Sequence, residues 1–148
     1  MPVIALIRDY PSSDALAGIH ILLVDDDQDM CEALQFLLES YGAEVIPVHS
    51  AVEALVELQR SRPDVLLSDV VMPGESGYDL MRSITARKGK EAPPAAALSS
   101  YGKEIGQEQA IAAGFRSLLT KPVDPAALIE LVSDLAGRPR PERAPVWR

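Results

Sequence analysis

The stretch Val65-Leu66-Leu67-Ser68-Asp69-Val70-Val71-Met72-Pro73-Gly74 decides how the rest of the chain is interpreted. Its apolar first half and the Pro73-Gly74 pair are typical of a buried strand that ends at a turn. Ligands of open α/β sheets bind just outside the carboxyl ends of the strands. Asp69 stands at that position, so we expect its carboxylate to face a crevice. An aspartate after a strand can also serve only as a turn residue, and Asp69 alone does not decide between these roles.

Apolar segments on both sides of this stretch alternate with segments of helical periodicity. We expect strands at residues 19–24, 43–48, 65–69, 94–98 and 115–120. Helices are expected between consecutive strands and after the last one. Ser50-Ala51-Val52-Glu53 has the form of a capping box, and Asp124-Pro125 supplies an N-cap and a first helical residue. Strands that alternate with helices in this way favour an α/β fold with a parallel sheet covered on both faces.

Composition and charge limit the possible functions. The 148 residues are 47% hydrophobic, which is enough for one domain with its own core. The formal net charge of −8 argues against direct nucleic-acid binding, which needs a basic face. No apolar run approaches the roughly 18 residues that span a membrane, and the first residues lack a basic leader, so we expect a cytoplasmic protein without membrane insertion. The single cysteine, Cys31, falls in a helical pattern, where a packed thiol is expected.

The domain limits follow from the outermost signals. Residues 1–18 are interpreted as an N-terminal extension or linker, because Pro11-Ser12-Ser13-Asp14 reads as a connecting segment. Residues 19–136 carry all the expected strands and helices. Residues 137–148 are rich in arginine and proline and are expected to form a flexible tail.

Polar side chains follow the carboxyl ends of the expected strands. Asp25 and Asp26 close the first strand, Asp69 the third, Ser99 the fourth and Lys121 the fifth. Parallel strands end at one edge of a sheet, so we expect these side chains to share one crevice. Clustered carboxylates repel one another unless a cation neutralises them, and oxygen ligands in a wet site suit Mg²⁺. With a hydroxyl and an ammonium that can hold phosphoryl oxygens, they indicate phosphoryl transfer to an aspartate.

These residues also resemble a known family. Val24-Asp25-Asp26, Asp69-Val70-Val71-Met72-Pro73 with Gly77, Ser99, and Lys121-Pro122 are similar to the motifs of the receiver domain of two-component response regulators. Receivers of this kind also occur in hybrid histidine kinases. The resemblance implies a flavodoxin-like, doubly wound sheet of five parallel strands in the order 2-1-3-4-5. It also implies a cis peptide bond before the proline of the last motif.

The resemblance implies a set of metal ligands. Asp26 and Asp69 would bind Mg²⁺ directly, together with the main-chain carbonyl of Val71, whereas Asp25 would act through a water molecule. All four positions match the family's motifs in this sequence.

The resemblance also implies the chemistry and the partners. Asp69 would be the phosphoacceptor, and Ser99 and Lys121 would contact the phosphoryl group. The donor would be a histidine kinase or a phosphotransfer protein, and the signal would pass to a downstream protein target. The chain would then not be an enzyme for an external substrate, but a phosphoacceptor that assists its own phosphorylation and dephosphorylation. The sequence also leaves a homodimer open.

One position departs from the family's pattern. Leu118 stands three residues before Lys121, where the family commonly has Tyr or Phe. A leucine offers no ring that swings between solvent and core. We therefore expect Tyr101 and residues 100–106 to change exposure on phosphorylation, and Leu118 to stay packed.

Two alternative functions use the same residues. A Mg²⁺-dependent phosphohydrolase of the haloacid dehalogenase type also has an aspartate at a strand end. That family requires Thr or Val where Asp25-Asp26-Asp27-Gln28-Asp29 has its last aspartate, and it needs a substrate-covering cap for which the chain leaves no room. A pseudo-receiver would bind partners without being phosphorylated. The complete acidic set and Lys121 argue against it.

Overall fold

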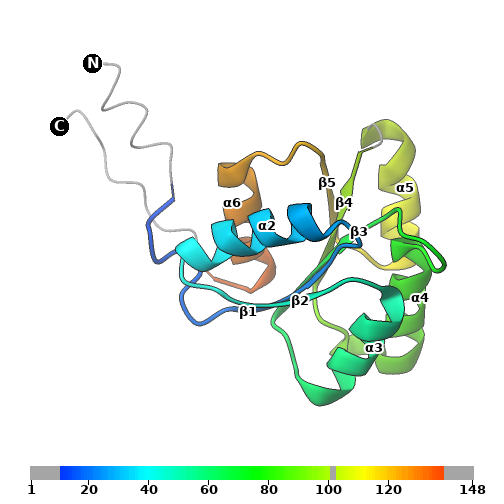
Figure 1. Cartoon of the computed structure of the whole chain (residues 1–148). Helices are drawn as coiled ribbons and strands as arrows, with labels where there is room; N and C mark the ends of the chain where they lie inside the picture. Colours follow the sequence, from blue (N-terminus) through cyan, green and yellow to red (C-terminus); the bar gives the residue numbers. More distant parts are fainter. Residues whose placement is uncertain (1–10, 101–102, 139–148) are drawn as a thin grey trace.

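Five parallel strands form the centre of the molecule (Figure 1). The computed structural model describes residues 11–100 and 103–138. The strands are β1 (His20–Val24), β2 (Glu44–Val48), β3 (Val65–Asp69), β4 (Ala95–Ser99) and β5 (Ser117–Thr120). They lie in the order β2-β1-β3-β4-β5, and each neighbouring pair is parallel. The expected α/β class and the flavodoxin-like strand order 2-1-3-4-5 are confirmed.

Helices cover both faces of this sheet. They are α2 (Gln28–Ser40), α3 (Ala51–Arg60), α4 (Gly77–Lys88), α5 (Lys103–Ala113) and α6 (Pro125–Leu135), with a short 3-10 helix, η1 (Gly89–Glu91). Figure 1 shows α2 and α6 on one face and α3, α4 and α5 on the other. None of the helices that the structure describes combines the length and apolarity that a membrane span requires.

Side-chain caps define where four of the helices begin. Asp27, Ser50, Ser76 and Asp124 each accept a hydrogen bond from a main-chain N–H in the first turn of α2, α3, α4 and α6. Such caps satisfy N–H groups that have no partner within the helix. The N-caps at Ser50 and Asp124 were expected from the sequence. The capping box predicted at Ser50 is only half formed, because the Glu53 carboxylate accepts from the N–H of His49; α4 has a complete box, formed by Ser76 and Asp79.

The core consists of two apolar layers, one on each face of the sheet. Side chains alternate along β1, where Leu22 and Val24 contribute to the α3–α5 layer and Ile21 and Leu23 to the α2–α6 layer. All four are at most 1% exposed. Cys31 packs in the α2–α6 layer as expected, and its burial, with a smaller effect from nearby carboxylates, raises the pKa of its thiol to about 11.

The folded domain begins earlier than the sequence analysis predicts. Leu16 is fully buried in the α2–α6 layer, and its N–H donates to the carbonyl of Tyr41 at 2.9 Å. A Cβ at Gly42 would lie 2.9 Å from the Cα of Ala17, so the two backbones pack closely. The Arg138 guanidinium donates to the Ala17 carbonyl.

The segment from Ala15 onward therefore packs into the domain and does not act as a free linker. Gly137 and Arg138, assigned to the tail, likewise bond back to α6. The remaining parts of the predicted extension and tail, residues 1–10 and 139–148, lie outside the described residues.

β2 is an edge strand that contains a proline. Pro47 pairs with Leu23 of β1, and the N–H of Glu44 donates inward to the carbonyl of Ile19 at 2.9 Å. Because alternate residues of a strand point their main-chain groups to opposite sides, Val45 and Pro47 direct theirs away from the sheet. Pro47 has no N–H to offer there.

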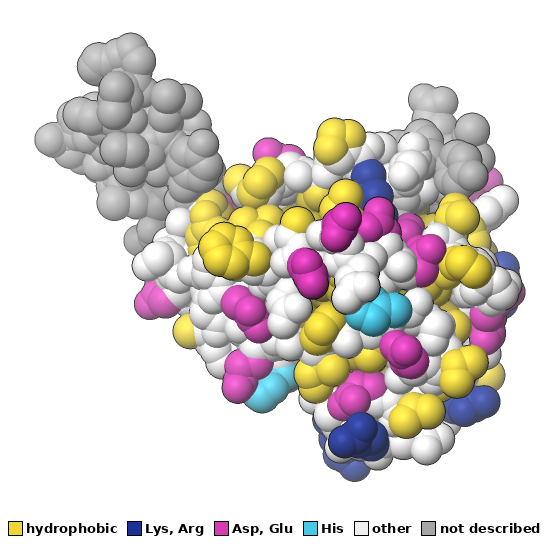
Figure 2. All heavy atoms as spheres, in the orientation of Figure 1, with side chains coloured by type: hydrophobic (Ala, Val, Ile, Leu, Met, Phe, Trp, Pro, Cys, Tyr) yellow, Lys and Arg dark blue, Asp and Glu magenta, His cyan; other side chains and the backbone are white. Residues whose placement is uncertain are grey.

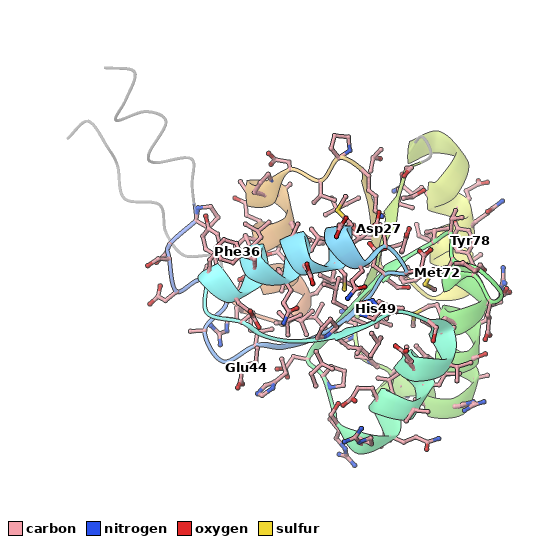
Figure 3. All side chains as sticks on the ribbon, in the orientation of Figure 1. Asp27, Phe36, Glu44, His49, Met72 and Tyr78 are labelled. Atoms are coloured by element: carbon pink, nitrogen blue, oxygen red, sulfur yellow. The ribbon has the colours of Figure 1, made fainter. Side chains whose placement is uncertain are left out.

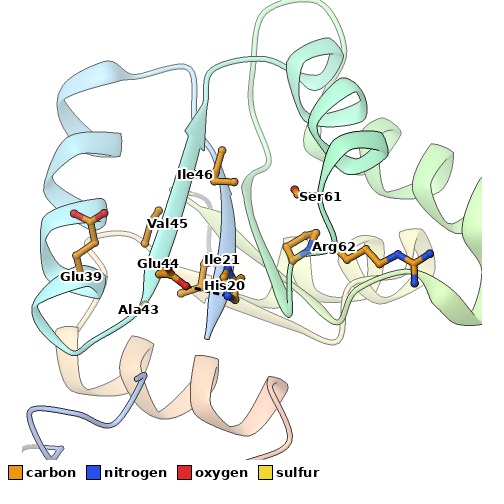
Figure 4. Close-up of a pocket in the computed structure, with 10 residues that line it drawn as sticks. His20, Ile21, Glu39, Ala43, Glu44, Val45, Ile46, Ser61 and Arg62 are labelled. Carbon is orange, nitrogen blue, oxygen red and sulfur yellow. Dashed lines mark ion pairs between the residues drawn. The ribbon is translucent and has the colours of Figure 1, made fainter. Parts of the chain in front are cut away.

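A hollow of about 700 Å³ lies beside this edge strand (Figure 4). Its floor and rim include His20 and Glu44, whose side chains form an ion pair at 2.9 Å, and its far wall is the loop at Ser61 and Arg62. Both members of the ion pair are more than half exposed, so the pair adds little stability. The hollow adjoins the amino ends of the strands and contains none of the expected site residues.

The burial of Leu16 leads to a stability prediction. Leu16→Ala should lower the free energy of unfolding by about 2–5 kcal/mol, the usual cost of removing a buried leucine side chain. Val52→Ala is the control, because Val52 is 67% exposed. Urea unfolding of both variants tests this. Equal midpoints for Leu16→Ala and the wild type would show that residues 15–18 do not pack into the domain.

Candidate functional site

The carboxyl ends of two neighbouring strands, β1 and β3, bring the expected acidic residues together. Asp25 follows β1 and is fully buried, Asp26 is exposed beside it, and Asp69 ends β3 with 8% of its surface exposed. One oxygen from each carboxylate lies within 4.8 Å of the others. The crevice expected at this edge of the sheet is therefore an acidic cluster that is partly shielded from water.

Lys121, which follows β5, joins this cluster. Its Nζ lies 3.3 Å from Asp25 Oδ2 and 3.3 Å from Asp69 Oδ2. Only 13% of the Lys121 side chain is exposed. Burial alone would lower the pKa of Lys121, but the charges of Asp69 and Asp25 outweigh it and raise that pKa. The lysine therefore stays charged.

Opposing effects act on the pKa of Asp69. Burial raises its pKa above the ordinary value of 3.8, the Lys121 charge lowers it, and the charge of Asp25 raises it again. The net direction is upward, so the ionised form of Asp69 is less stable in the folded protein than in water. A cation that joins the cluster would therefore stabilise the ionised form of Asp69.

His49, which the sequence analysis did not single out, holds the loop that carries Asp25. Its Nδ1 lies 3.0 Å from the Asp25 carbonyl oxygen, and its main-chain N–H donates to Glu53 at 2.8 Å. The N–H of Asp27 also donates to Asp25 Oδ1 at 2.9 Å. Figure 3 labels His49 and Asp27 beside the start of α2. The His49 contact holds the main chain at Asp25, and the Asp27 N–H holds one oxygen of the buried carboxylate.

Gly77 sets the path of the chain after Asp69. Its N–H donates to the carbonyl of Val70 at 2.8 Å, and a Cβ at this position would overlap the carbonyl oxygen of Asp69. Only glycine permits this approach, which closes the loop between β3 and α4. The match to Gly77 in the sequence motif thus has a steric reason.

Ser99 lies at the end of β4, next to the lysine strand. It is 1% exposed, and its main-chain carbonyl accepts a hydrogen bond from the N–H of Lys121 at 2.7 Å. The peptide bond between Lys121 and Pro122 is cis, as expected. The structure therefore places Ser99 at the same edge as the acidic cluster.

Leu118 is packed in the core, as expected for a leucine at this position. It is 4% exposed, and a Cβ at Gly106 of α5 would lie 3.2 Å from Leu118 Cδ1. The hydroxyl of Tyr78, labelled in Figure 3, donates to the Gly106 carbonyl at 3.4 Å. Tyr101, expected to replace the aromatic switch, lies outside the described residues.

The structure thus gathers Asp25, Asp26, Asp69 and Lys121, with Ser99 at the neighbouring strand end. Val71 lies in the loop after β3 with 53% of its surface exposed. The role of its carbonyl as a metal ligand stays a prediction.

Comparison with known proteins agrees with this geometry. Residues 21–133 match the family described as the response regulator receiver domain. The chain belongs to this family. The receiver domain is 44% identical over 117 residues to an uncharacterized 14.6 kDa protein of Leptolyngbya boryana, a match that covers 79% of this chain and 89% of the relative.

A longer relative and a solved structure extend the comparison. The transcriptional regulatory protein GlrR of Escherichia coli is 33% identical over 129 residues, covering 87% of this chain but 29% of GlrR. The receiver domain of the sensor histidine kinase PA1611 from Pseudomonas aeruginosa is 30% identical with a TM-score of 0.74, covering 82% of this chain and 99% of that one. That structure has a magnesium ion in its active-site cleft.

The raised pKa of Asp69 predicts how the site affects stability. A carboxyl whose pKa is higher in the folded state than in the unfolded state costs stability once the pH exceeds both values. At pH 7 without metal, Asp69→Asn should therefore melt about 2–5 °C above the wild type. Mg²⁺ should raise the melting temperature of the wild type more than that of Asp69→Asn.

Glu108→Gln, an exposed change on α5, is the control for both measurements. Lower stability of Asp69→Asn than of the wild type at pH 7 would contradict the assigned balance of burial and charge.

Proposed function

We propose that Asp69 accepts a phosphoryl group from a histidine kinase or phosphotransfer protein in the presence of Mg²⁺. The observation that carries this proposal is the contact of one lysine ammonium with both Asp25 and Asp69. The ammonium keeps a charged oxygen of Asp69 available in a largely buried position. The same ammonium can hold an oxygen of an incoming phosphoryl group.

The acidic cluster fits Mg²⁺. Ligand oxygens bind this ion at about 2.0–2.1 Å, so two of them on opposite sides lie about 4.2 Å apart. The oxygens of Asp25, Asp26 and Asp69 already lie within 4.8 Å of one another. Asp26 and Asp69 would hold the ion with the Val71 carbonyl, and Asp25 would contribute through water. The bound ion would neutralise charge on the carboxylates and the phosphoryl oxygens.

The residues of the chain supply the transfer chemistry. An oxygen of ionised Asp69 attacks the phosphorus of a phosphohistidine, an acyl phosphate bond forms, and the phosphorus–nitrogen bond to the imidazole breaks. Lys121 and the hydroxyl of Ser99 orient the phosphoryl oxygens. The nucleophile carries no proton, so the step needs no base on this chain.

The cellular role follows from this chemistry. The domain would act in the cytoplasm as a phosphoacceptor that assists its own phosphorylation and dephosphorylation, without turnover of an external substrate. A downstream protein would recognise the phosphorylated form, with no direct contact to nucleic acid. Membership of the receiver family does not favour the phosphohydrolase alternative.

Intact mass measurement tests the acceptor directly. Incubation with acetyl phosphate and Mg²⁺ should add one phosphate to the wild type and none to Asp69→Asn. Chelation of the metal should abolish the adduct, because the cluster then repels the anionic donor. Glu108→Gln, an exposed change on α5, should behave as the wild type. An adduct that persists in Asp69→Asn would assign the acceptor to another residue, with Asp26 the first to examine.

Hydrogen exchange tests the readout of phosphorylation. With beryllofluoride, a phosphoryl mimic, residues 100–106 should change protection while Leu118 does not. Gly106, inside α5, lowers the stability of this helix by about 1 kcal/mol relative to alanine, and weakly stable segments are repositioned most easily. Asp69→Asn with the same reagent is the control. Changes centred on β5 would instead show that Leu118 moves.

A further inference from the structure

The carboxyl ends of the strands and the amino ends of the strands differ in the charge of the residues around them. The acidic cluster occupies the carboxyl ends of the strands, whereas a group of cations lies at the opposite edge, where α3 and α4 end. This group, called the basic patch below, consists of Arg60, Arg62, Arg87, Lys88 and Lys90. Figure 2 shows lysine and arginine side chains gathered at the bottom of the view, below α3. In a chain with a net charge of −8, such a concentration calls for a physical reason.

Helix dipoles account for only part of the basic patch. Cations in the last turn of a helix are favourable, and Arg60, Arg87 and Lys88 occupy such positions. The same effect would act on α2, α5 and α6, yet these described helices have no basic residue in the last turn. Arg62 and Lys90 lie beyond the ends of α3 and α4.

Among the described residues, most cations of the basic patch have no ion-pair partner. Within the described residues, Arg60 is the one member with an ion-pair partner, Glu57, at 3.8 Å. Four of the five cations are exposed, and Lys88 is half-buried. Most of the positive charge of the patch is therefore available to bind another molecule.

Two small hollows lie within the patch and share Lys88 and Leu58. One, of about 180 Å³, is lined also by Arg62, Pro63 and Pro93, and the other, of about 200 Å³, by Ile84 and others of α3 and α4. Both are smaller than the roughly 300–1,000 Å³ of small-molecule sites, so each suits one side chain of a partner rather than a whole ligand.

We propose that the basic patch docks an acidic segment of a partner protein that also carries apolar side chains. The carboxylates of the segment would meet Arg62, Lys88 and Lys90, and its apolar side chains would enter the two hollows. Charge complementarity would select the partner and speed its association, while apolar burial would hold it. The proposal goes beyond phosphorylation, because the patch lies at the far edge of the sheet from Asp69.

The chemistry of the patch favours a protein segment over other polyanions. The apolar floors formed by Leu58 and Ile84 offer nothing to a phosphate backbone, whereas a peptide can fill them with side chains. The cations are also few for nucleic acid, whose binding rests on many phosphate contacts. A peptide can instead place an apolar side chain between two carboxylates.

Binding of a defined peptide tests the proposal. A synthetic peptide of alternating Glu and Leu should shift amide resonances of residues 55–63 and 84–93 in two-dimensional NMR. The variant Arg62→Gln/Lys88→Gln/Lys90→Gln should bind it at least about tenfold more weakly. Arg82→Gln is the matched control, because this cation of α4 lies outside the patch and pairs with Asp79 at 2.8 Å. A peptide of Glu and Ser should bind more weakly than the Glu–Leu peptide.

Several outcomes would overturn the proposal. These are no shifts at millimolar Glu–Leu peptide, shifts that map elsewhere, or equal binding by the triple variant. Tighter binding of duplex DNA or of phosphatidylserine vesicles would assign the patch to another class of partner, and shifts that grow with protein concentration alone would assign it to a second copy. Asp69→Asn should bind the peptide as the wild type does, so a failed phosphorylation test leaves this one independent.

Discussion

The contact of one lysine with two aspartates holds the functional edge of this domain together. Lys121 reaches from the end of β5, past β4 and its Ser99, to carboxylates that follow β1 and end β3. The ammonium and both carboxylates are largely removed from water, where ionic contacts are strong and an unpaired charge is costly. Removal of the lysine would leave two carboxylates facing each other in a buried crevice. The packing of the strand ends and the chemistry of the site therefore depend on the same ammonium.

The sequence was sufficient to predict the helices and strands and most residues of the site. Apolar runs such as 19–24 and 65–69 are long enough to be recognised as buried strands, and caps such as Asp124 mark helix starts. Because parallel strands end at one edge, Asp25, Asp69 and Lys121 could be placed together without coordinates. The strand order needed the family resemblance, since hydrophobic periodicity does not say which strands are neighbours.

Other features depend on contacts that no local pattern encodes. His49 acts through a hydrogen bond to the carbonyl of Asp25, and a main-chain acceptor leaves no mark in the sequence. Leu16 is buried because it packs against the turn after α2, where its N–H bonds to the carbonyl of Tyr41. The segment around Leu16 is too short to show a hydrophobic periodicity. Gly77 was visible as a motif residue, but its overlap with the Asp69 carbonyl could be seen only in three dimensions.

The proline in β2 has a consequence for how the molecule behaves among copies of itself. An edge strand with free N–H groups is a template on which another chain can add a strand, the first step toward fibrous aggregates. Val45 and Pro47 direct their main-chain groups outward from β2, but only the valine has an N–H, so a docking strand would find one of the two donors missing. The β2 side of the sheet is thereby made a poorer seed for intermolecular growth. This protection rests on a single residue, because any other amino acid at position 47 would restore the missing donor.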